Sequence, residues 1–227
     1  DTLRSYNYIC HFTVFSKELY NIVGGFRSEF DGSQDYDMIL RLTEKAKNIV
    51  HIPKILYYWR AHSGSTALEI SAKPYVMDAA KKALKEHIER IGLEGEVEDS
   101  RISSTYRIKY KIKGEPKISI IIPNKDHIDD LDKCLKSIFE KSTYKNFEII
   151  IVENNSVDDD TFGYYDTLKY NDKVKIVYWD KEFNYSAIND YGFKFAEGEY
   201  IVLLNNDIEI ITPQWLEEML MFAQRKD

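Results

Sequence analysis

The second half of the chain alternates between short apolar runs and amphipathic segments. The apolar runs lie at 117–123, 147–154, 174–179 and 199–207, and polar residues end or follow each of them. Such runs are typical of strands buried on both faces of a parallel sheet. Segments with helical spacing of apolar residues follow at 131–139, 158–168, 185–196 and 213–225, the last with Pro213 as its first helical residue. This alternation predicts an α/β unit with a parallel, doubly wound sheet.

The middle region, residues 71–116, has a different pattern. Apolar residues from Val76 to Ile91 lie along one side of a Lys/Glu-rich helix that Gly92 and Gly95 end. Residues 104–114 then alternate strictly, with Tyr and Ile on one face and Lys and Arg on the other. This alternation predicts a half-exposed strand whose lysines protect an edge. We interpret the region as a connector.

The first region, residues 1–70, mixes short elements. We expect strands at YICHFTVF (8–15) and HIPKILYYWR (51–60), with a short helix, the turn GGF and a helix at 36–45 between them. The chain therefore divides into segments 1–70, 71–116 and 117–227.

Composition narrows the class of protein. With 44% hydrophobic and 30% charged residues, the chain has the make-up of a soluble globular protein of one or two domains. A net charge of -7 argues against a general nucleic-acid binder, although a single nucleotide needs only a local site. Two cysteines are too few for a disulfide framework, so we expect a cytoplasmic setting. No run approaches the roughly 18 apolar residues that span a bilayer. The chain opens without Met and stops inside a predicted helix, so we expect it to continue in a longer protein.

Polar residues follow all four predicted strands of the second half. They include Asn124 and Lys125, Glu153 to Ser156, Asp180 to Asn184, and Asn205 to Asp207. Asn, Asp and Ser also form turns and caps, so each end taken alone has a structural explanation. The carboxyl ends of parallel strands share one rim, where ligands bind, and four such ends together favour a site.

The chain contains no Gly-rich phosphate loop. Neither G-x-G-x-x-G nor G-x-x-x-x-G-K-[ST] occurs, which excludes the usual dinucleotide and P-loop interpretations. A nucleotide diphosphate held without such a loop needs another counter-charge, most naturally Mg²⁺ or Mn²⁺. Asp207, at the end of the fourth strand, is placed to bind that ion.

Several motifs resemble family 2 glycosyltransferases. SIIIPNKD, IIIVENNSVDD, FNYSAINDYG and GEYIVLLNNDIEI resemble the nucleotide-binding half of that family, with NND in the place of its D-x-D metal motif. FSKELYNIVGGFRSEFDGSQDYDMILRL and HIPKILYYWRAHSGST resemble its acceptor half. The resemblance covers about four-fifths of the chain and implies a GT-A fold, a Rossmann-like and mostly parallel sheet flanked by helices.

The two halves stand in the reverse of the family's order. One explanation is a protein with two tandem modules, of which this chain holds the end of one and the start of the next. The alternative is a circularly permuted module, in which the strand at 8–15 completes the sheet beside residues 199–207. Halves with unfinished sheets also suggest a swapped dimer.

The resemblance implies a role for each matching residue. Pro123 and Asn124 would lie against the nucleobase, and Glu153 would contact the base or ribose. The nucleotide site would also include Asn155, Asp180 and Asn184. The metal ligands would be Asp207 and His62, and the catalytic base would be Asp35.

These roles imply an inverting, metal-dependent transfer of sugar from a nucleotide-diphosphate donor to an acceptor hydroxyl. The acceptor would be a glycan or lipid-linked sugar in polysaccharide or cell-surface glycan synthesis, with the full-length protein at a membrane surface. Asn205 and Gln34 depart from the family's usual Asp and Glu. Asp35 and Asp207 also belong to different halves, so a nucleotide-sugar-binding fragment without transfer activity is the alternative. A nucleotidyltransferase ranks lower, because residues 123–130 lack that class's Gly-rich basic loop.

Overall fold

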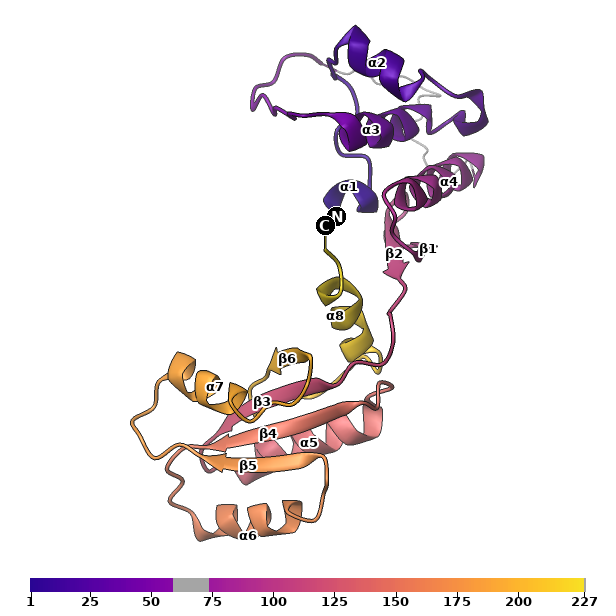
Figure 1. Cartoon of the computed structure of the whole chain (residues 1–227). Coiled ribbons are helices and arrows are strands. Elements are labelled where there is room, and N and C mark those ends of the chain that lie inside the picture. The colour runs from indigo at the N-terminus through magenta and orange to yellow at the C-terminus, as the bar shows by residue number, and fades with distance from the viewer. Residues whose placement is uncertain (59–73, 227) are drawn as a thin grey trace. The chain divides into compact units, whose positions relative to one another are not determined.

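A computed structural model describes residues 1–58 and 74–226 and divides the chain into two compact units, Asp1–Lys111 and Ile112–Asp227 (Figure 1). The first unit contains α1 (Thr2–Ser5), α2 (Lys17–Val23), the 3-10 turn η1 (Ser28–Phe30), α3 (Gln34–Lys45), α4 (Pro74–Arg90), β1 (Gly95–Asp99) and β2 (Tyr106–Tyr110). The second contains β3 (Ile118–Asn124), α5 (Ile128–Lys141), β4 (Phe147–Glu153), α6 (Asp159–Leu168), β5 (Val174–Tyr178), α7 (Tyr185–Phe193), β6 (Tyr200–Leu203) and α8 (Trp215–Ala223).

The second unit is built on a four-stranded parallel sheet with the order β5-β4-β3-β6. All four predicted strands are present, and the predicted α/β class with a parallel sheet is confirmed. The chain winds outward from β3 to β4 and β5, and then returns to place β6 on the other side of β3. A parallel sheet that reverses its winding in this way forms a crevice at the carboxyl ends of the strands beside the reversal.

Helices cover both faces of this sheet, as Figure 1 shows. Alternate residues of β3 and β4, such as Ile120 and Ile149, are fully buried against α5, α6 and α8. The residues between them, such as Ile121, pack on the other face against α7. Gly192 allows this approach, because a Cβ at that position would lie 2.6 Å from a methyl carbon of Ile121. Burial on both faces explains why these strands are apolar at nearly every position.

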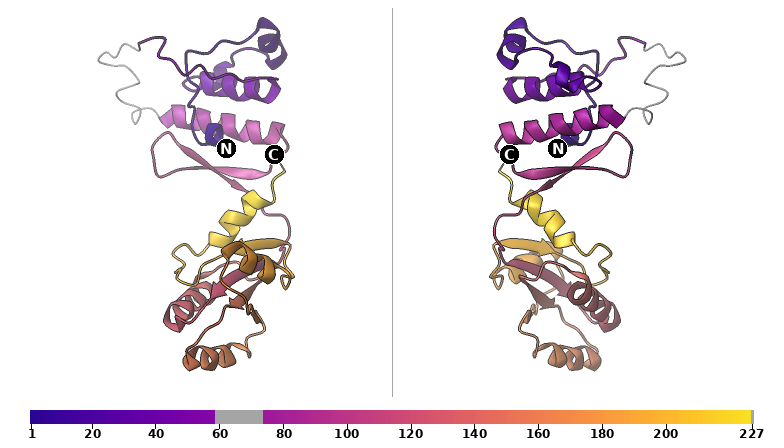
Figure 2. Two further views of the ribbon diagram at one scale, coloured as in Figure 1. Left: turned by 90° about the vertical axis from the view of Figure 1, so that its left-hand side faces the viewer. Right: turned by 90° about the vertical axis from the view of Figure 1, so that its right-hand side faces the viewer.

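In the first unit, α4 lies between α3 and the β1–β2 hairpin (Figures 1 and 2). Its Ala80, Ala83 and Leu84 pack with Phe30, Leu40 and Tyr106 in one small core. The predicted helix of the middle region is confirmed, and so is the alternation in β2, where Tyr106, Ile108 and Tyr110 are buried and Arg107 and Lys109 are exposed. Gly95 begins β1, which pairs antiparallel with β2.

The two strands predicted in the first region are wrong within the described residues. Residues 8–15 and 51–58 form neither strands nor helices, so 8–15 adds nothing to the parallel sheet. The two segments touch one another through the ring of Tyr57, which lies 5.8 Å from that of Phe12 and whose hydroxyl donates to the carbonyl of His11. Much of their apolar surface is exposed, including Val14 at 86% and Ile55 at 88%. The backbone of a strand needs a second strand with which to form hydrogen bonds. These segments have the apolar composition of strands but are not paired with one.

The start of the last helix also differs from the prediction. Helix α8 begins at Trp215 with Gln214 as N-cap, and Pro213 lies in the turn before it. The indole N–H of Trp215 donates to the Ser142 hydroxyl at 2.9 Å, and Thr143 N–H donates to the Pro213 carbonyl at 3.0 Å. These contacts fix the turn to the end of α5, and the helix begins only after it.

Candidate functional site

A pocket of about 550 Å³ opens at the carboxyl ends of β3, β4 and β6, where the sheet reverses its winding. It is lined by Pro123, Asn124, Lys125, His127, Asn154, Asn155, Glu182, Phe183, Tyr185, Ile188, Asn205 and Asn206. The lining is rich in side-chain amides and also holds the basic Lys125 and His127, the acidic Glu182, and the rings of Phe183 and Tyr185. The predicted rim of polar strand ends therefore forms one pocket.

Three of the predicted nucleotide-binding residues line this pocket, namely Pro123, Asn124 and Asn155. Asn124 is only 3% exposed. Its amide nitrogen donates to the Tyr165 hydroxyl at 2.8 Å, and its amide oxygen accepts from the Asn206 amide at 2.6 Å. The Asn155 amide donates to the Lys181 carbonyl at 2.9 Å and joins the end of β4 to the loop before α7.

Glu153 does not line the pocket, because its side chain points into the protein and is 2% exposed. Its carboxylate accepts from the backbone N–H and the hydroxyl of Ser156, at 2.5 and 2.7 Å, and from the Tyr165 hydroxyl at 2.7 Å. Burial, together with the neighbouring Glu153 carboxylate, raises the pKa of the Tyr165 phenol far above its usual value, so the phenol remains a hydrogen-bond donor.

The other predicted residues of the second unit lie beside the pocket. Asp180 and Asp207 are exposed and do not line the pocket. Asp207 nevertheless directly follows Asn205 and Asn206, and these two residues do line it. Asn184 is the N-cap of α7, where its side-chain oxygen accepts from the Ala187 N–H at 3.0 Å.

The prediction missed four residues that give the pocket much of its chemistry. Lys125 offers positive charge, His127 offers an imidazole that can form hydrogen bonds, and Phe183 and Tyr185 offer exposed rings. An aromatic ring can stack on a nucleobase, and cationic groups attract phosphate. The position of two of them in the sequence could have identified them, because Lys125 and Phe183 lie in the segments directly after β3 and β5. His127 and its neighbour Asp126 have left-handed backbone (φ 49° and 50°), which no sequence pattern marked.

Asp126 fixes the loop after β3, which carries Lys125 and His127. Its carboxylate accepts from the N–H groups of Asp158 and Val157 at 3.0 and 2.8 Å, and these bonds hold its pKa below the usual value. Its own N–H donates to the Ser156 hydroxyl at 2.8 Å. The loop after β3 is therefore tied to the loop after β4, and both line the same pocket.

Asp207 is the carboxylate at the end of β6 that the sequence predicts as a metal ligand, and Glu182 is a second carboxylate in the pocket lining. Within residues 1–58 and 74–226, no three His, Cys, Asp or Glu side chains come together as a metal site. His62, the second predicted ligand, lies outside the described residues. Mg²⁺ is often held by one or two carboxylates and completed by substrate phosphates and water, so Asp207 fits a metal that arrives with a diphosphate.

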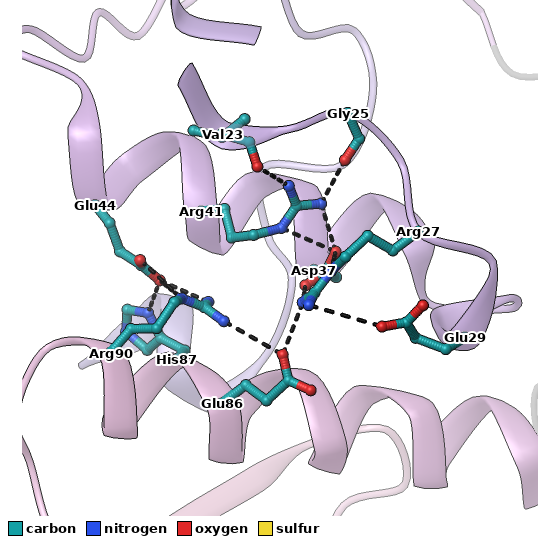
Figure 3. Close-up of polar contacts among 10 residues, drawn as sticks. All are labelled: Val23, Gly25, Arg27, Glu29, Asp37, Arg41, Glu44, Glu86, His87 and Arg90. Atoms are coloured by element: carbon teal, nitrogen blue, oxygen red, sulfur yellow. Dashed lines mark hydrogen bonds and ion pairs between the residues drawn. The ribbon is translucent and has the colours of Figure 1, made fainter. Parts of the chain in front are cut away.

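In the first unit, Asp35 lies in the first turn of α3 and is half-buried. Its carboxylate accepts from the Asn7 amide at 3.1 Å. Its neighbour Asp37 is instead fully buried, as expected for a structural residue at a helix start, and forms ion pairs with Arg27 and Arg41 at 2.5 and 2.6 Å (Figure 3). Burial alone would raise the pKa of Asp37, but the two guanidinium groups outweigh it and hold the pKa below its usual value.

Figure 3 shows that this ion-pair network continues onto α4. Glu86 contacts Arg27 at 2.9 Å and Arg90 at 3.5 Å, and Glu44 accepts from His87 and Arg90, each at 2.7 Å. Arg41 also donates to the carbonyls of Val23 and Gly25. The network therefore joins α3, α4 and the end of α2, and it fixes the first turn of α3, where Asp35 lies.

These features define the second unit as an α/β domain with a ligand pocket at the reversal of its parallel sheet. Residues 119–227, which lie in the second unit, match the family model described as Glycosyl transferase family 2.

The similarity to known proteins extends over both units. The chain is 42% identical over 229 residues to the uncharacterized protein y4gI of Sinorhizobium fredii (strain NBRC 101917 / NGR234), with 99% of this chain and 25% of that protein covered. It is 40% identical over 227 residues to the O-antigen biosynthesis protein RfbC of Myxococcus xanthus, with 100% and 18% covered. The chain thus spans a quarter or less of the length of these relatives.

Among solved structures, this chain is similar to the mannosyltransferase PcManGT from Pyrobaculum calidifontis in complex with GDP-Man and Mn²⁺. The match covers 50% of this chain and 34% of that protein, with 15% identity and a TM-score of 0.46. In the described part of the chain, no helix combines the length and apolar character needed to cross a bilayer.

Proposed function

We propose that this chain is part of a glycosyltransferase that moves a sugar from a nucleotide-diphosphate donor to an acceptor hydroxyl, in polysaccharide or cell-surface glycan synthesis. The observation that carries the proposal is the family 2 match of residues 119–227, together with the pocket at the carboxyl ends of β3, β4 and β6. The similarity to RfbC, an O-antigen biosynthesis protein, supports this kind of product.

The donor nucleotide would occupy this pocket. Phe183 and Tyr185 are 67% and 50% exposed and are available to stack on a base. Lys125 lines the same pocket and would attract the diphosphate, and the imidazole of His127 would donate a hydrogen bond to it. Asn155 and the buried Asn124 would complete the contacts from β3 and β4, whereas Glu153 acts from beneath the pocket through Tyr165 and Ser156. Asp180 and Asn184 would support the donor from the loop before α7.

Asp207 would hold a Mn²⁺ or Mg²⁺ ion that bridges the donor phosphates. Such an ion stabilises the charge that develops on the leaving diphosphate. Asn205, in place of a second carboxylate, leaves the phosphates to supply more of the metal's ligands.

Asp35 would act as the base that takes the proton of the acceptor hydroxyl, which is a poor nucleophile until it is deprotonated. A single displacement would invert the anomeric centre. The described contact of Asp35 is a single amide donor, Asn7, and a half-buried carboxylate is open to an acceptor. His62 would assist as a metal ligand in the site to which Asp35 belongs.

Two tandem modules would explain the order of the halves. The alignments to y4gI and RfbC run through both units over nearly the whole chain, so the same order occurs in longer relatives. In that arrangement Asp35 and Asp207 serve different active sites. A circularly permuted single module, or a dimer that swaps halves, would instead bring them into one site. We place the protein in the cytoplasm, with the full-length chain at a membrane surface near its glycan or lipid-linked acceptor.

Calorimetric titration with UDP, with and without Mn²⁺, tests the donor site. We expect Mn²⁺-dependent binding that Asp207→Ala abolishes or weakens at least about tenfold, as expected for loss of a charge-assisted contact. Asp172→Ala is the matched control, because Asp172 is an exposed carboxylate in the turn before β5, at the opposite end of the strands.

GDP and dTDP extend the titration if UDP does not bind. No binding of any of the three by a chain with folded circular dichroism would refute the donor site. Donor-dependent product formation then separates a transferase from a nucleotide-sugar-binding fragment, which would bind the donor without consuming it.

A further inference from the structure

The network beneath the pocket centres on one buried phenol that no sequence motif marked. Tyr165 lies on α6 and is 1% exposed, and it is not among the residues that line the pocket. Its hydroxyl donates to Glu153 at 2.7 Å and accepts from the amide nitrogen of Asn124 at 2.8 Å. It therefore joins the last residues of two neighbouring strands, β4 and β3.

The network continues from Tyr165 to the third strand end. With its nitrogen engaged by Tyr165 and by the Asp126 carbonyl at 3.0 Å, the Asn124 amide has a fixed orientation. Its oxygen then accepts from the Asn206 amide nitrogen at 2.6 Å. The orientation of the Asn206 amide, including its oxygen, is therefore set by two successive hydrogen bonds, from Asn206 to Asn124 and from Asn124 to Tyr165. Asn206 lines the pocket and directly precedes Asp207.

We propose that Tyr165 is a positioning residue for donor binding, because its phenol sets the orientation of the Asn124 amide and, through it, of Asn206. This inference rests on the proposed function. An amide can turn over and exchange its donor and its acceptor, so a fixed partner decides which group it presents. Pre-orientation of polar groups lowers the cost of ordering them when a ligand binds.

Glu153 gives the phenol its direction. An ionised carboxylate only accepts hydrogen bonds, so the phenol proton is committed to Glu153 and its oxygen lone pairs remain for Asn124. The amide of Asn124 must then turn its nitrogen toward Tyr165 and its oxygen toward Asn206. Each hydrogen bond in this series fixes the next. The three residues that begin it are buried, since Glu153 is 2% exposed, Tyr165 1% and Asn124 3%.

The same helix offers a matched control. Tyr164 also donates its hydroxyl to a carboxylate, Asp132 on α5 at 3.0 Å, but neither residue lines the pocket. Tyr164→Phe and Tyr165→Phe therefore remove the same group from adjacent positions of α6, and only the second change reaches the pocket. Thermal unfolding of both variants shows that the comparison is made on folded protein.

The test measures UDP, GDP and dTDP affinity by calorimetry in the full chain, with Mn²⁺ present and well below the unfolding midpoint. The side-chain amide resonances of Asn124 and Asn206 are recorded by ¹⁵N NMR without Mn²⁺. For Tyr165→Phe we expect nucleotide binding weaker by roughly three- to tenfold, the size of one hydrogen bond, and shifted resonances of both amides. Tyr164→Phe should leave both measurements at the wild-type values.

Three outcomes overturn the inference, and one of them also removes the proposed function. Wild-type affinity in Tyr165→Phe would show that the phenol does not position the donor site, with the proposed function intact. Equal weakening in both tyrosine variants would reduce Tyr165 to a structural residue of α6. If the wild-type chain binds none of the three nucleotides, the proposed donor site fails and the role of Tyr165 in it fails with it. Weakening and amide shifts confined to Tyr165→Phe support the inference.

Discussion

Two aspartates in the first turn of α3 have opposite surroundings. Asp37 is fully buried between two arginines, whereas Asp35 is half-buried and meets one amide. A buried carboxylate must be paired to remain charged, and its partners depend on it in the same way. We therefore assign Asp37 to the stability of the first unit, and the proposed role of Asp35 as a base does not conflict with its surroundings.

Replacement of Asp37 should be far more costly than replacement of Asp35. Asp37→Asn leaves the buried guanidinium of Arg41 without its carboxylate, and we expect a loss of about 3 kcal/mol in the free energy of unfolding. Asp35→Asn removes part of one hydrogen bond and should cost about 1 kcal/mol or less. Urea unfolding followed by circular dichroism measures both. Equal losses in the two variants would contradict the assignment.

The residues of the candidate site could be located from the sequence, but their orientation could not. Strand ends in a parallel sheet share a rim, and Pro123, Asn124 and Asn155 line the pocket at this rim, while their nucleotide-binding role stays a prediction. Glu153 also ends a strand, yet its side chain turns inward because Tyr165 and Ser156 offer it buried donors. Those partners lie on a different element or depend on loop geometry, and neither is visible in a pattern of strand ends.

At the scale of elements, the contact between α3 and α4 carries a second group of charges. Glu44 on α3 accepts from His87 and Arg90 on α4, and it is nearly buried. Burial alone would raise the pKa of Glu44, but its bonds to His87 and Arg90 lower it to about 2 from the usual 4.5. A carboxylate with a lowered pKa stabilises the fold above its usual pKa, and this contribution is lost as the pH falls toward the folded value.

The stability of the first unit should therefore fall between about pH 4.5 and pH 2. We expect Glu44→Gln to lose about 2–3 kcal/mol at pH 7, on the scale of 1.4 kcal/mol per unit of pKa. The difference from wild type should shrink as the pH falls through this range. Glu94→Gln is the control, because its carboxylate pairs with Lys111 at the surface and should contribute little at any pH. Urea midpoints across pH give the test, and a constant difference would contradict it.

The elements of the two halves were not equally predictable. Residues 118–203 combine apolar strands with helices whose partners lie within the same unit, so the pattern and the fold agree. Residues 8–15 and 51–58 have the composition of strands but lie outside any sheet. Composition indicates which segments favour extended backbone, whereas pairing requires a second strand in reach. A local pattern cannot show whether one is present.

At the scale of the whole molecule, each unit has its own core. The two apolar clusters around the parallel sheet contain residues of the second unit alone, and the cluster around Phe30 and Leu84 contains residues of the first alone. Every residue that lines the pocket also belongs to the second unit. Among the described residues, the second unit therefore contains its own core and all of the residues that line the pocket.

Residues 112–227 expressed alone should fold and keep the pocket. We expect one cooperative thermal transition and a nucleotide affinity within about threefold of the full chain, since no lining residue is removed. Calorimetry and circular dichroism measure these properties. An unfolded fragment would show that the first unit supports the sheet.

The order of strands in the parallel sheet has a consequence for synthesis. Ile118 of β3 pairs with Tyr200 of β6, so β3 leaves the ribosome about 80 residues before the partner on that edge. At roughly 5–20 residues per second, the edge waits for roughly 4–16 seconds. During that time a strand with four isoleucines presents open backbone groups to any other nascent chain. We therefore expect the yield of native protein to depend on how fast ribosomes cross residues 125–199 and on chaperones that bind β3 during that time.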